Sequence, residues 1–297
     1  MLASRGFEGF ALLTTERART AAPEVAGAAA TVLDVPPGPV PEAAAAVRSG
    51  VEGRPVVALG GGRVIDSAKA IAGADELRAA AIPTTLSGAE MTPFHRMPAG
   101  VDVFKLVRPS LVIAEPGLMT SQPMPGLAAS AMNALAHAVE ALYTPLANPV
   151  SDLAALRAAS LLGGENTDLA LGAVLAGYAS GAAGFAVHHA VCQTIVRTAG
   201  TPHAQTNAVM LPHFVRMMQG RAPEKMDRLA EALGVSDAAE RVAELAARAG
   251  VTRLSDLGVD GAALDEIVAA SLQHPAVQNT PDPPGEAELR EVLGQAL

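Results

Sequence analysis

The chain has 297 residues, half of them hydrophobic and 17% charged, which suits a globular protein long enough for two domains. A formal net charge of −9 and the lack of Trp argue against nucleic-acid binding by phosphate neutralisation or base stacking. Cys192 is the only cysteine, which excludes an intrachain disulfide and a cysteine-based zinc site and favours a reducing cytoplasm.

The first part of the chain alternates short apolar runs with alanine-rich segments. Strands are expected at 10–14, 30–35, 55–59, 78–83 and 110–114, and helices at 16–29, 40–49 and 64–74. This alternation with short loops is typical of a parallel sheet that carries helices on both faces. We therefore expect an α/β domain over residues 1–118.

The remainder reads as helix without strand-like alternation. The boundary is expected in the stretch that carries Pro116, Pro123 and Pro125. Helices are predicted at 125–144, 149–163, 167–188, 189–199, 205–219, 223–233, 236–249, 260–272 and 285–296. The sequence thus predicts an all-helical second domain over residues 119–297.

Three consecutive glycines, Gly60 to Gly62, separate the third predicted strand from its helix. Glycines there let the backbone approach a ligand closely, and the free N–H groups of the helix start attract an anion such as a pyrophosphate. Thr84, Thr85 and Ser87 follow the next strand and would add hydroxyl donors at the same sheet edge. A tight turn without a ligand remains an alternative, because this is not the GxGxxG pattern.

A second constellation joins an amide to several histidines. Asn133 and His137 lie four apart in a helical run and so share one face. His188, His189 and His203 come from later segments. A divalent metal would use His137, His189, His203 and a carboxylate, whose place Asn133 takes. The alternatives are imidazoles that bind a substrate carboxylate or deliver a proton, and histidines scattered without a shared role.

These motifs together resemble one superfamily. Residues 60–69 resemble the GGGSxxDxAK turn of the iron-containing (group III) alcohol dehydrogenase and dehydroquinate-synthase-like superfamily. Residues 83–93 are similar to the PTTxAGSEMTP form of its maleylacetate-reductase branch. Residues 132–143 resemble its MNALAHxVEALY stretch, and 188–192 with 202–208 resemble its HHxxCH…LPHAETxA pattern. The resemblance covers nearly the whole chain.

The resemblance implies a nucleotide-binding α/β domain and a helical domain, with the active site in the cleft. It implies reduction of a small carbonyl or enone by NADH or NADPH, in that branch of maleylacetate to 3-oxoadipate during aromatic-compound breakdown, and a homodimer. The implied cofactor residues are Gly60, Gly61, Gly62, Arg63, Asp66, Thr84, Thr85 and Ser87. The implied catalytic residues are Asn133, His137, His189 and His203, the last three being the metal ligands wherever iron or zinc is bound.

The chain departs from the superfamily pattern at particular positions. Arg63 stands where Ser is usual beside the phosphates, and Gln193 replaces the second His of the HxxxH motif. The chain is also shorter than its relatives. Two alternatives therefore stay open beside the reductase: a non-redox lyase, isomerase or condensing enzyme, and a non-catalytic homologue that keeps the fold.

Overall fold

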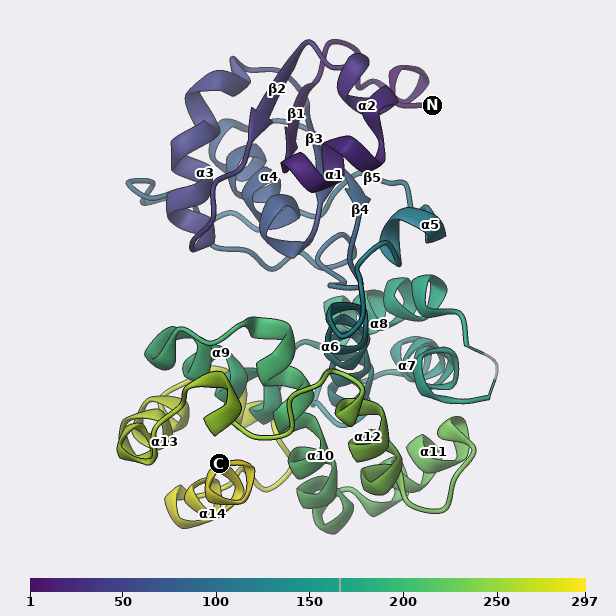
Figure 1. Ribbon diagram of the computed structural model, residues 1–297, viewed down its shortest axis with the longest axis vertical. Coiled ribbons are helices and arrows are strands. Elements are labelled where there is room, and N and C mark those ends of the chain that lie inside the picture. The colour runs from purple at the N-terminus through teal and green to yellow at the C-terminus, as the bar shows by residue number, and fades with distance from the viewer. Residues whose placement is uncertain (166) are drawn as a thin grey trace. The chain divides into compact units, whose positions relative to one another are not determined.

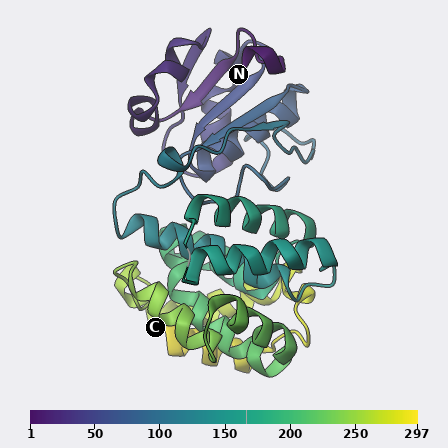
Figure 2. The same cartoon turned by 90° about the vertical axis from the view of Figure 1, so that its right-hand side faces the viewer.

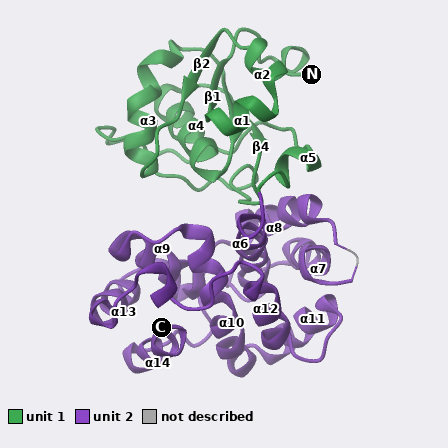
Figure 3. Ribbon diagram, viewed as in Figure 1, with its two compact units in different colours: residues 1–122 green, residues 123–297 purple. Residues whose placement is uncertain are grey.

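The computed structural model describes residues 1–165 and 167–297. The chain divides into two compact units, Met1–Gln122 and Pro123–Leu297 (Figure 3). The expected boundary at 118/119 falls inside a short helix, Pro116–Met119 (α5), a few residues before this division. The predicted combination of an α/β unit and a helical unit is confirmed.

Unit 1 is built on a five-stranded sheet in which all neighbours are parallel. The strands are Ala11–Thr14 (β1), Thr31–Asp34 (β2), Val56–Gly60 (β3), Ala79–Pro83 (β4) and Leu111–Val112 (β5). Their order is β2-β1-β3-β4-β5. The central strands β3 and β4 are buried along their whole length, as strands covered on both faces are.

Helices cover both faces of this sheet (Figure 1). Glu16–Ala21 (α1), Pro23–Gly27 (α2) and α5 lie over one face, and Val40–Arg48 (α3) and Gly62–Asp75 (α4) over the other. Side chains alternate between the faces along each strand, so Leu12, Val57 and Leu59 pack towards α1 while Leu13 and Ala58 pack towards α3 and α4. The short 3-10 helices of this unit are Ala3–Arg5 and Ser49–Val51.

Three expectations for unit 1 need correction. The predicted helix 16–29 is two helices, because Pro23 cannot continue α1 and instead begins α2. The predicted strand 110–114 pairs over only two residues, Leu111 and Val112. The predicted helix 64–74 begins two residues earlier, at Gly62, so the last of the three glycines belongs to the helix itself.

Unit 2 is helical among its described residues. Its α-helices are Gly126–Ala141 (α6), Pro149–Gly163 (α7), Leu169–Ala183 (α8), Val187–Ala199 (α9), His203–Arg221 (α10), Pro223–Leu233 (α11), Ala238–Ala247 (α12), Leu264–Leu272 (α13) and Glu286–Ala296 (α14); the 3-10 helices are Ser255–Leu257, Gly261–Ala263 and Pro275–Asn279. Helix α6 is buried on nearly all sides and packs against α7, α8 and α10. Its many alanines permit this close packing.

The break between α8 and α9 comes earlier than predicted. The sequence placed it at 188/189, but α8 ends at Ala183 and Gly184 takes a φ of +82°, which side chains disfavour. His188 and His189 therefore both lie in the first turn of α9. Helices α7 and α8 lie side by side (Figure 2). Among the described residues, no single helix has the length and hydropathy of a membrane span, and α8 with α9 meets that test only as a pair bent by 100°.

Candidate functional site

The glycine turn of unit 1 lies where the strand order of the sheet reverses, between β1 and β3. The chain runs from β1 to β2 on one side and from β3 through β4 to β5 on the other, so β1 and β3 are neighbours whose connections diverge. Parallel sheets bind ligands at this point, beyond the carboxyl ends of the strands. Gly60 ends β3, Gly61 precedes α4 and Gly62 is its first residue, which places the turn at this edge.

The turn fits closely against the segment that follows β4. A Cβ built on Gly61 would lie 2.9 Å from Cγ2 of Thr85, and one built on Gly62 would lie 3.2 Å from Cβ of Ser87. Only glycine allows this approach without displacing a neighbour. The Thr84 backbone N–H donates to the Gly60 carbonyl at 2.9 Å, so the structure brings the predicted glycines together with all three predicted hydroxyl residues.

The same edge offers donors that suit an anion. The N-cap residue of α4 is Gly61, which has no side chain to cap the helix, and the positive end of the helix dipole lies there. The Thr85 hydroxyl is buried and has no hydrogen-bond partner among the described residues. Both observations fit the pyrophosphate of a dinucleotide.

The remaining predicted cofactor residues lie around this turn with different roles. Arg63 is exposed on the first turn of α4. Asp66 forms an ion pair with the buried Lys69, 2.7 Å from Oδ1 to Nζ. The Thr84 hydroxyl accepts a hydrogen bond from Arg17 at 2.9 Å, and Arg17 also donates to Ser121.

Arg17 was not anticipated from the sequence. It lies in the first turn of α1, directly after β1, and its guanidinium reaches the end of β4. The position of Arg17 directly after a predicted strand could have indicated it, as the same position indicated Thr84. Residues that follow a strand gather at the carboxyl edge of a parallel sheet.

In unit 2, helix α6 carries a separate group of polar side chains. Asn133, His137 and Glu140 are spaced by four and three residues, so they share one face, and all three are buried. The Asn133 amide nitrogen lies 3.3 Å from Nε2 of His137. Glu140 was not among the predicted site residues, although its spacing from His137 places it on the same face.

Glu140 holds His189 by two hydrogen bonds. Its Oε2 lies 2.6 Å from Nδ1 of His189, and its Oε1 accepts from the His189 backbone N–H at 3.2 Å. The opposite ring atom, Nε2, is buried without a hydrogen-bond partner among the described residues. Burial lowers the pKa of His189 to about 3, with His203 as a second cause, and burial raises the pKa of Glu140. Both groups are therefore favoured in their uncharged forms.

The imidazole rings form one connected group. His137 stacks on His189 with ring centroids 4.4 Å apart, and the Phe185 ring lies against both, 4.8 Å from His189 and 5.7 Å from His137. His203 joins less directly: Asn207 accepts from Nε2 of His188 at 2.9 Å, and its amide nitrogen lies 3.3 Å from Nε2 of His203. Three of the four predicted catalytic residues, Asn133, His137 and His189, are thus in direct contact.

The tail of the chain fixes the start of α9, which carries His188 and His189. The Thr280 hydroxyl accepts the backbone N–H of Val187 at 3.1 Å, and Asn279 donates to the carbonyl of Phe185 at 2.8 Å. Cys192, one turn further along α9, is fully buried, and burial raises the pKa of its thiol. These contacts are structural, and they set the position of the histidines.

The histidine group does not have the geometry of a metal site. No three His, Cys, Asp or Glu side chains are grouped as ligands among residues 1–165 and 167–297. A metal binds in the plane of an imidazole at about 2.1 Å, and the planes of His137 and His189 are nearly parallel, 14° apart, so they share no such position. The amides of Asn133 and Asn207 also occupy Nε2 of His137 and of His203.

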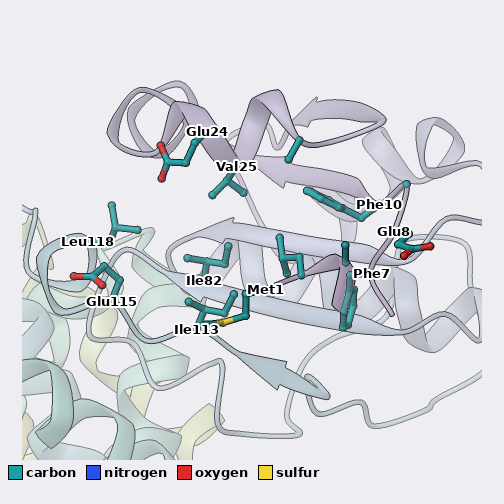
Figure 4. A pocket seen from close by; sticks show the side chains of 14 residues that line it. Met1, Phe7, Glu8, Phe10, Glu24, Val25, Ile82, Ile113, Glu115 and Leu118 are labelled. Atoms are coloured by element: carbon teal, nitrogen blue, oxygen red, sulfur yellow. The ribbon is translucent and has the colours of Figure 1, made fainter. Parts of the chain in front are cut away.

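A separate pocket of about 620 Å³ lies in unit 1 (Figure 4). Apolar side chains form most of its wall, including Met1, Phe7, Phe10, Ile82 and Ile113, with carboxylates at its edge. None of the predicted site residues lines it. The chemistry predicted from the sequence therefore belongs to the glycine turn and the histidine group.

Comparison with protein families gives a match over most of unit 2. The model for the Fe-containing alcohol dehydrogenase family, C-terminal, matches residues 127–297. Maleylacetate reductase 1 of Rhodococcus opacus is 39% identical over 261 residues, which is 81% of this chain and 72% of that protein. Maleylacetate reductase of Sphingobium indicum is 35% identical over 288 residues, 90% of this chain and 80% of that protein.

Solved structures give the same relationship for the fold. An iron-containing alcohol dehydrogenase from Corynebacterium glutamicum superposes with a TM-score of 0.89 at 30% identity, covering 100% of this chain and 90% of that one. Maleylacetate reductase from Rhizobium sp. strain MTP-10005 gives 0.85 at 30% identity, covering 100% and 91%. The similarity thus extends over both units of the chain.

Proposed function

The chain belongs to the Fe-containing alcohol dehydrogenase family, and we propose that it is an NAD(P)H-dependent reductase of the maleylacetate-reductase type, acting on a small carbonyl or enone dicarboxylate. The maleylacetate reductases of Rhodococcus opacus and Sphingobium indicum are similar to this chain over most of their length. The observation that carries the proposal is the buried Asn133–His137–His189 group with Glu140 behind it.

The cofactor is assigned to the glycine turn of unit 1. The first turn of α4 and the orphan hydroxyl of Thr85 supply donors for the pyrophosphate, and Gly61 and Gly62 allow it to approach the backbone. Arg63, exposed beside them, adds a positive charge. A reduced nicotinamide, when bound, supplies the hydride that reduces the substrate.

The protein must add a proton, and His189 is the residue that can deliver it. In this proposal the shared proton lies on Glu140, whose carboxyl donates to Nδ1 of His189 and leaves the imidazole proton on Nε2. When Nε2 gives up that proton, the proton of Glu140 can pass to Nδ1. The imidazole stays neutral and the charge ends on Glu140.

Asn133 and His137 bind and orient the substrate in this proposal. An amide donates and accepts hydrogen bonds without carrying charge, and Asn133 is held by His137 on a rigid buried helix. His203 is exposed at the start of α10 and acts through Asn207 and His188. No step is assigned to a metal, because the side chains present do not form its ligand set.

The test is a turnover and binding assay on the purified chain. Consumption of NADH or NADPH, followed by absorbance, is expected when maleylacetate is supplied. Calorimetric titration should detect binding of at least one reduced dinucleotide. Failure to bind either would contradict the proposal. Turnover of a substrate without any nicotinamide would instead support the non-redox alternative.

A further inference from the structure

Lys69 is a fully buried lysine whose ammonium group has three close oxygen neighbours. Its Nζ lies 2.7 Å from Oδ1 of Asp66 and donates to the backbone carbonyls of Ala89 and Thr92 at 2.9 and 3.1 Å. Lysine is almost never fully buried unless its charge is paired. The ammonium group therefore fills a cation site made of one carboxylate and two backbone carbonyls.

This site joins α4 to the segment that follows β4. Asp66 and Lys69 lie one turn apart on α4, whereas Ala89 and Thr92 belong to an irregular segment that turns at Gly88, with a φ of +72°. Ser87, just before that turn, is the residue in contact with Gly62. The attachment of residues 89–92 to Lys69 consequently sets how closely Ser87 approaches the glycine turn.

The charge of Lys69 also offsets the acidic groups around it. Glu90 lies between the two attached carbonyls and is fully buried, and burial raises its pKa to about 7, with Lys69 opposing and Asp66 adding to the rise. Burial lowers the pKa of His95, which follows on the same segment, and the charge of Lys69 lowers it further. Without the ammonium group, Asp66 would lose its ion-pair partner, and the pKa of both buried carboxyl groups would rise further.

We propose that Lys69 is a positioning residue of the dinucleotide site, which pairs with Asp66 on α4 and holds residues 85–92 against Gly61 and Gly62. The proposal rests on the dinucleotide site of the proposed function. It requires that loss of the ammonium group release the segment in the free protein and weaken binding of the cofactor. The hydride and proton steps should change less, since Lys69 contacts neither cofactor nor substrate.

The experiment compares the wild-type chain with Lys69→Met, which keeps the length of the side chain and removes its charge. Hydrogen exchange measured by mass spectrometry should become faster in peptides covering 85–92 without any cofactor present. NADPH or NADH, whichever the wild type binds, should bind at least 10-fold more weakly, with a rise in the KM for the cofactor and a smaller change in kcat. Lys69→Ala should recover part of its affinity in ethylammonium chloride, whose cation can occupy the vacated site, but not in an equal concentration of tetramethylammonium chloride.

Lys105→Met is the matched control, because Lys105 pairs with Glu76 at 2.9 Å on the exposed surface of the same unit. It should leave both exchange and binding unchanged. A folded Lys69→Met protein with wild-type exchange in 85–92 and wild-type affinity would overturn the inference. If Lys69→Met does not fold, Asp66→Asn provides the decision, since it removes the ion pair and should raise exchange in the same peptides. A wild type that binds no dinucleotide refutes the proposed function, while the exchange result still decides whether Lys69 holds the segment.

Discussion

At the scale of single residues, the most informative feature is a pair of buried carboxyl groups. Glu140 and Glu90 are both fully buried, one against His189 and the other beside Lys69. Sequence spacing placed His137 and Asn133 correctly on one face, but it could not rank Glu140 above other helix carboxylates. Its role depends on a partner 49 residues away that only the packing of α9 against α6 brings into contact.

Glu140→Gln is a sharp test of the proton pathway. Glutamine has the shape of a protonated glutamate: its NH₂ can donate to Nδ1 of His189 while its oxygen accepts the His189 backbone N–H. The fold and the affinity for cofactor should therefore be retained. It cannot pass on a proton, so kcat should fall by about 100-fold, within the range of general acid catalysis.

The control for that variant is Glu140→Leu, which removes both hydrogen bonds and leaves His189 unsupported. It should lower the melting temperature as well as kcat, whereas Glu140→Gln should lower kcat alone. A Glu140→Gln protein with wild-type kcat would show that the proton comes from elsewhere. Thermal unfolding and initial-rate kinetics measure the two effects separately.

Glu90 predicts a pH dependence of stability with an unusual sign for a carboxyl group. Burial raises its pKa from 4.5 to about 7, so between these pH values the native state binds a proton that the unfolded state has released. Its contribution to stability is fully present below pH 4.5 and is lost as pH rises through 7. Linkage over this interval amounts to roughly 3 kcal/mol.

Glu90→Gln isolates that contribution, because glutamine resembles the protonated acid and does not titrate. The free energy of unfolding of the variant, relative to wild type, should increase between pH 5 and pH 8. Urea unfolding at both pH values gives the difference directly, and other titrating groups cancel in the comparison. A difference that does not change with pH would contradict a raised pKa for Glu90.

At the scale of elements, sequence patterns located most helices and strands but not their local breaks. Long periodic runs such as 149–163 and 223–233 were predicted with their observed bounds, since hydrophobic period and capping residues agree there. The break at Gly184 was predicted too late, at 188/189, because the alanine- and glycine-rich run from α8 into α9 is apolar on all sides. No change of period marks the turn, and the left-handed glycine alone does not identify it.

The glycine turn gives a prediction at this scale. Gly61→Ala would place a methyl group 2.9 Å from Cγ2 of Thr85, so Thr85 and the turn must separate. We expect affinity for the dinucleotide to fall by 10-fold or more, measured by calorimetry, with a modest loss of thermal stability. The separation removes the orphan hydroxyl of Thr85 from its place beside the first turn of α4.

Gly294→Ala serves as the comparison variant. Gly294 lies in α14, where an added Cβ would meet nothing within 4 Å, so alanine should raise stability by up to about 1 kcal/mol through its helix propensity and leave cofactor binding unchanged. Equal cofactor affinity in both variants would show that the close approach at Gly61 is not needed for binding.

At the scale of the whole molecule, each unit has its own core and its own share of the proposed chemistry. The cofactor residues lie in Met1–Gln122 and the histidine group in Pro123–Leu297. The chain length predicted two domains, and the family resemblance predicted which chemistry each would carry. The pairing of Lys69 with carbonyls twenty and more residues away could not be predicted, since backbone carbonyls leave no mark in a sequence.

The homodimer implied by the resemblance remains a prediction at this scale. Light scattering coupled to gel filtration should give twice the chain mass of 30.0 kDa. A mass equal to one chain at micromolar concentration would contradict it. The measurement should be repeated with the reduced dinucleotide present, to separate a constitutive dimer from one that depends on cofactor.

Because Cys192 is buried, the reactivity of its thiol reports how often the surrounding helices open. The only thiol in the sequence lies fully buried within unit 2, against His188 and the carbonyl of Thr206, and its raised pKa keeps it protonated. An aromatic disulfide reagent can react with it only when α9 and α10 part. The rate at which the reagent releases its coloured thiolate therefore measures how often the helical unit opens. Because no other cysteine is present in the sequence, a cysteine introduced at a chosen surface position can be labelled without removing a second reactive thiol.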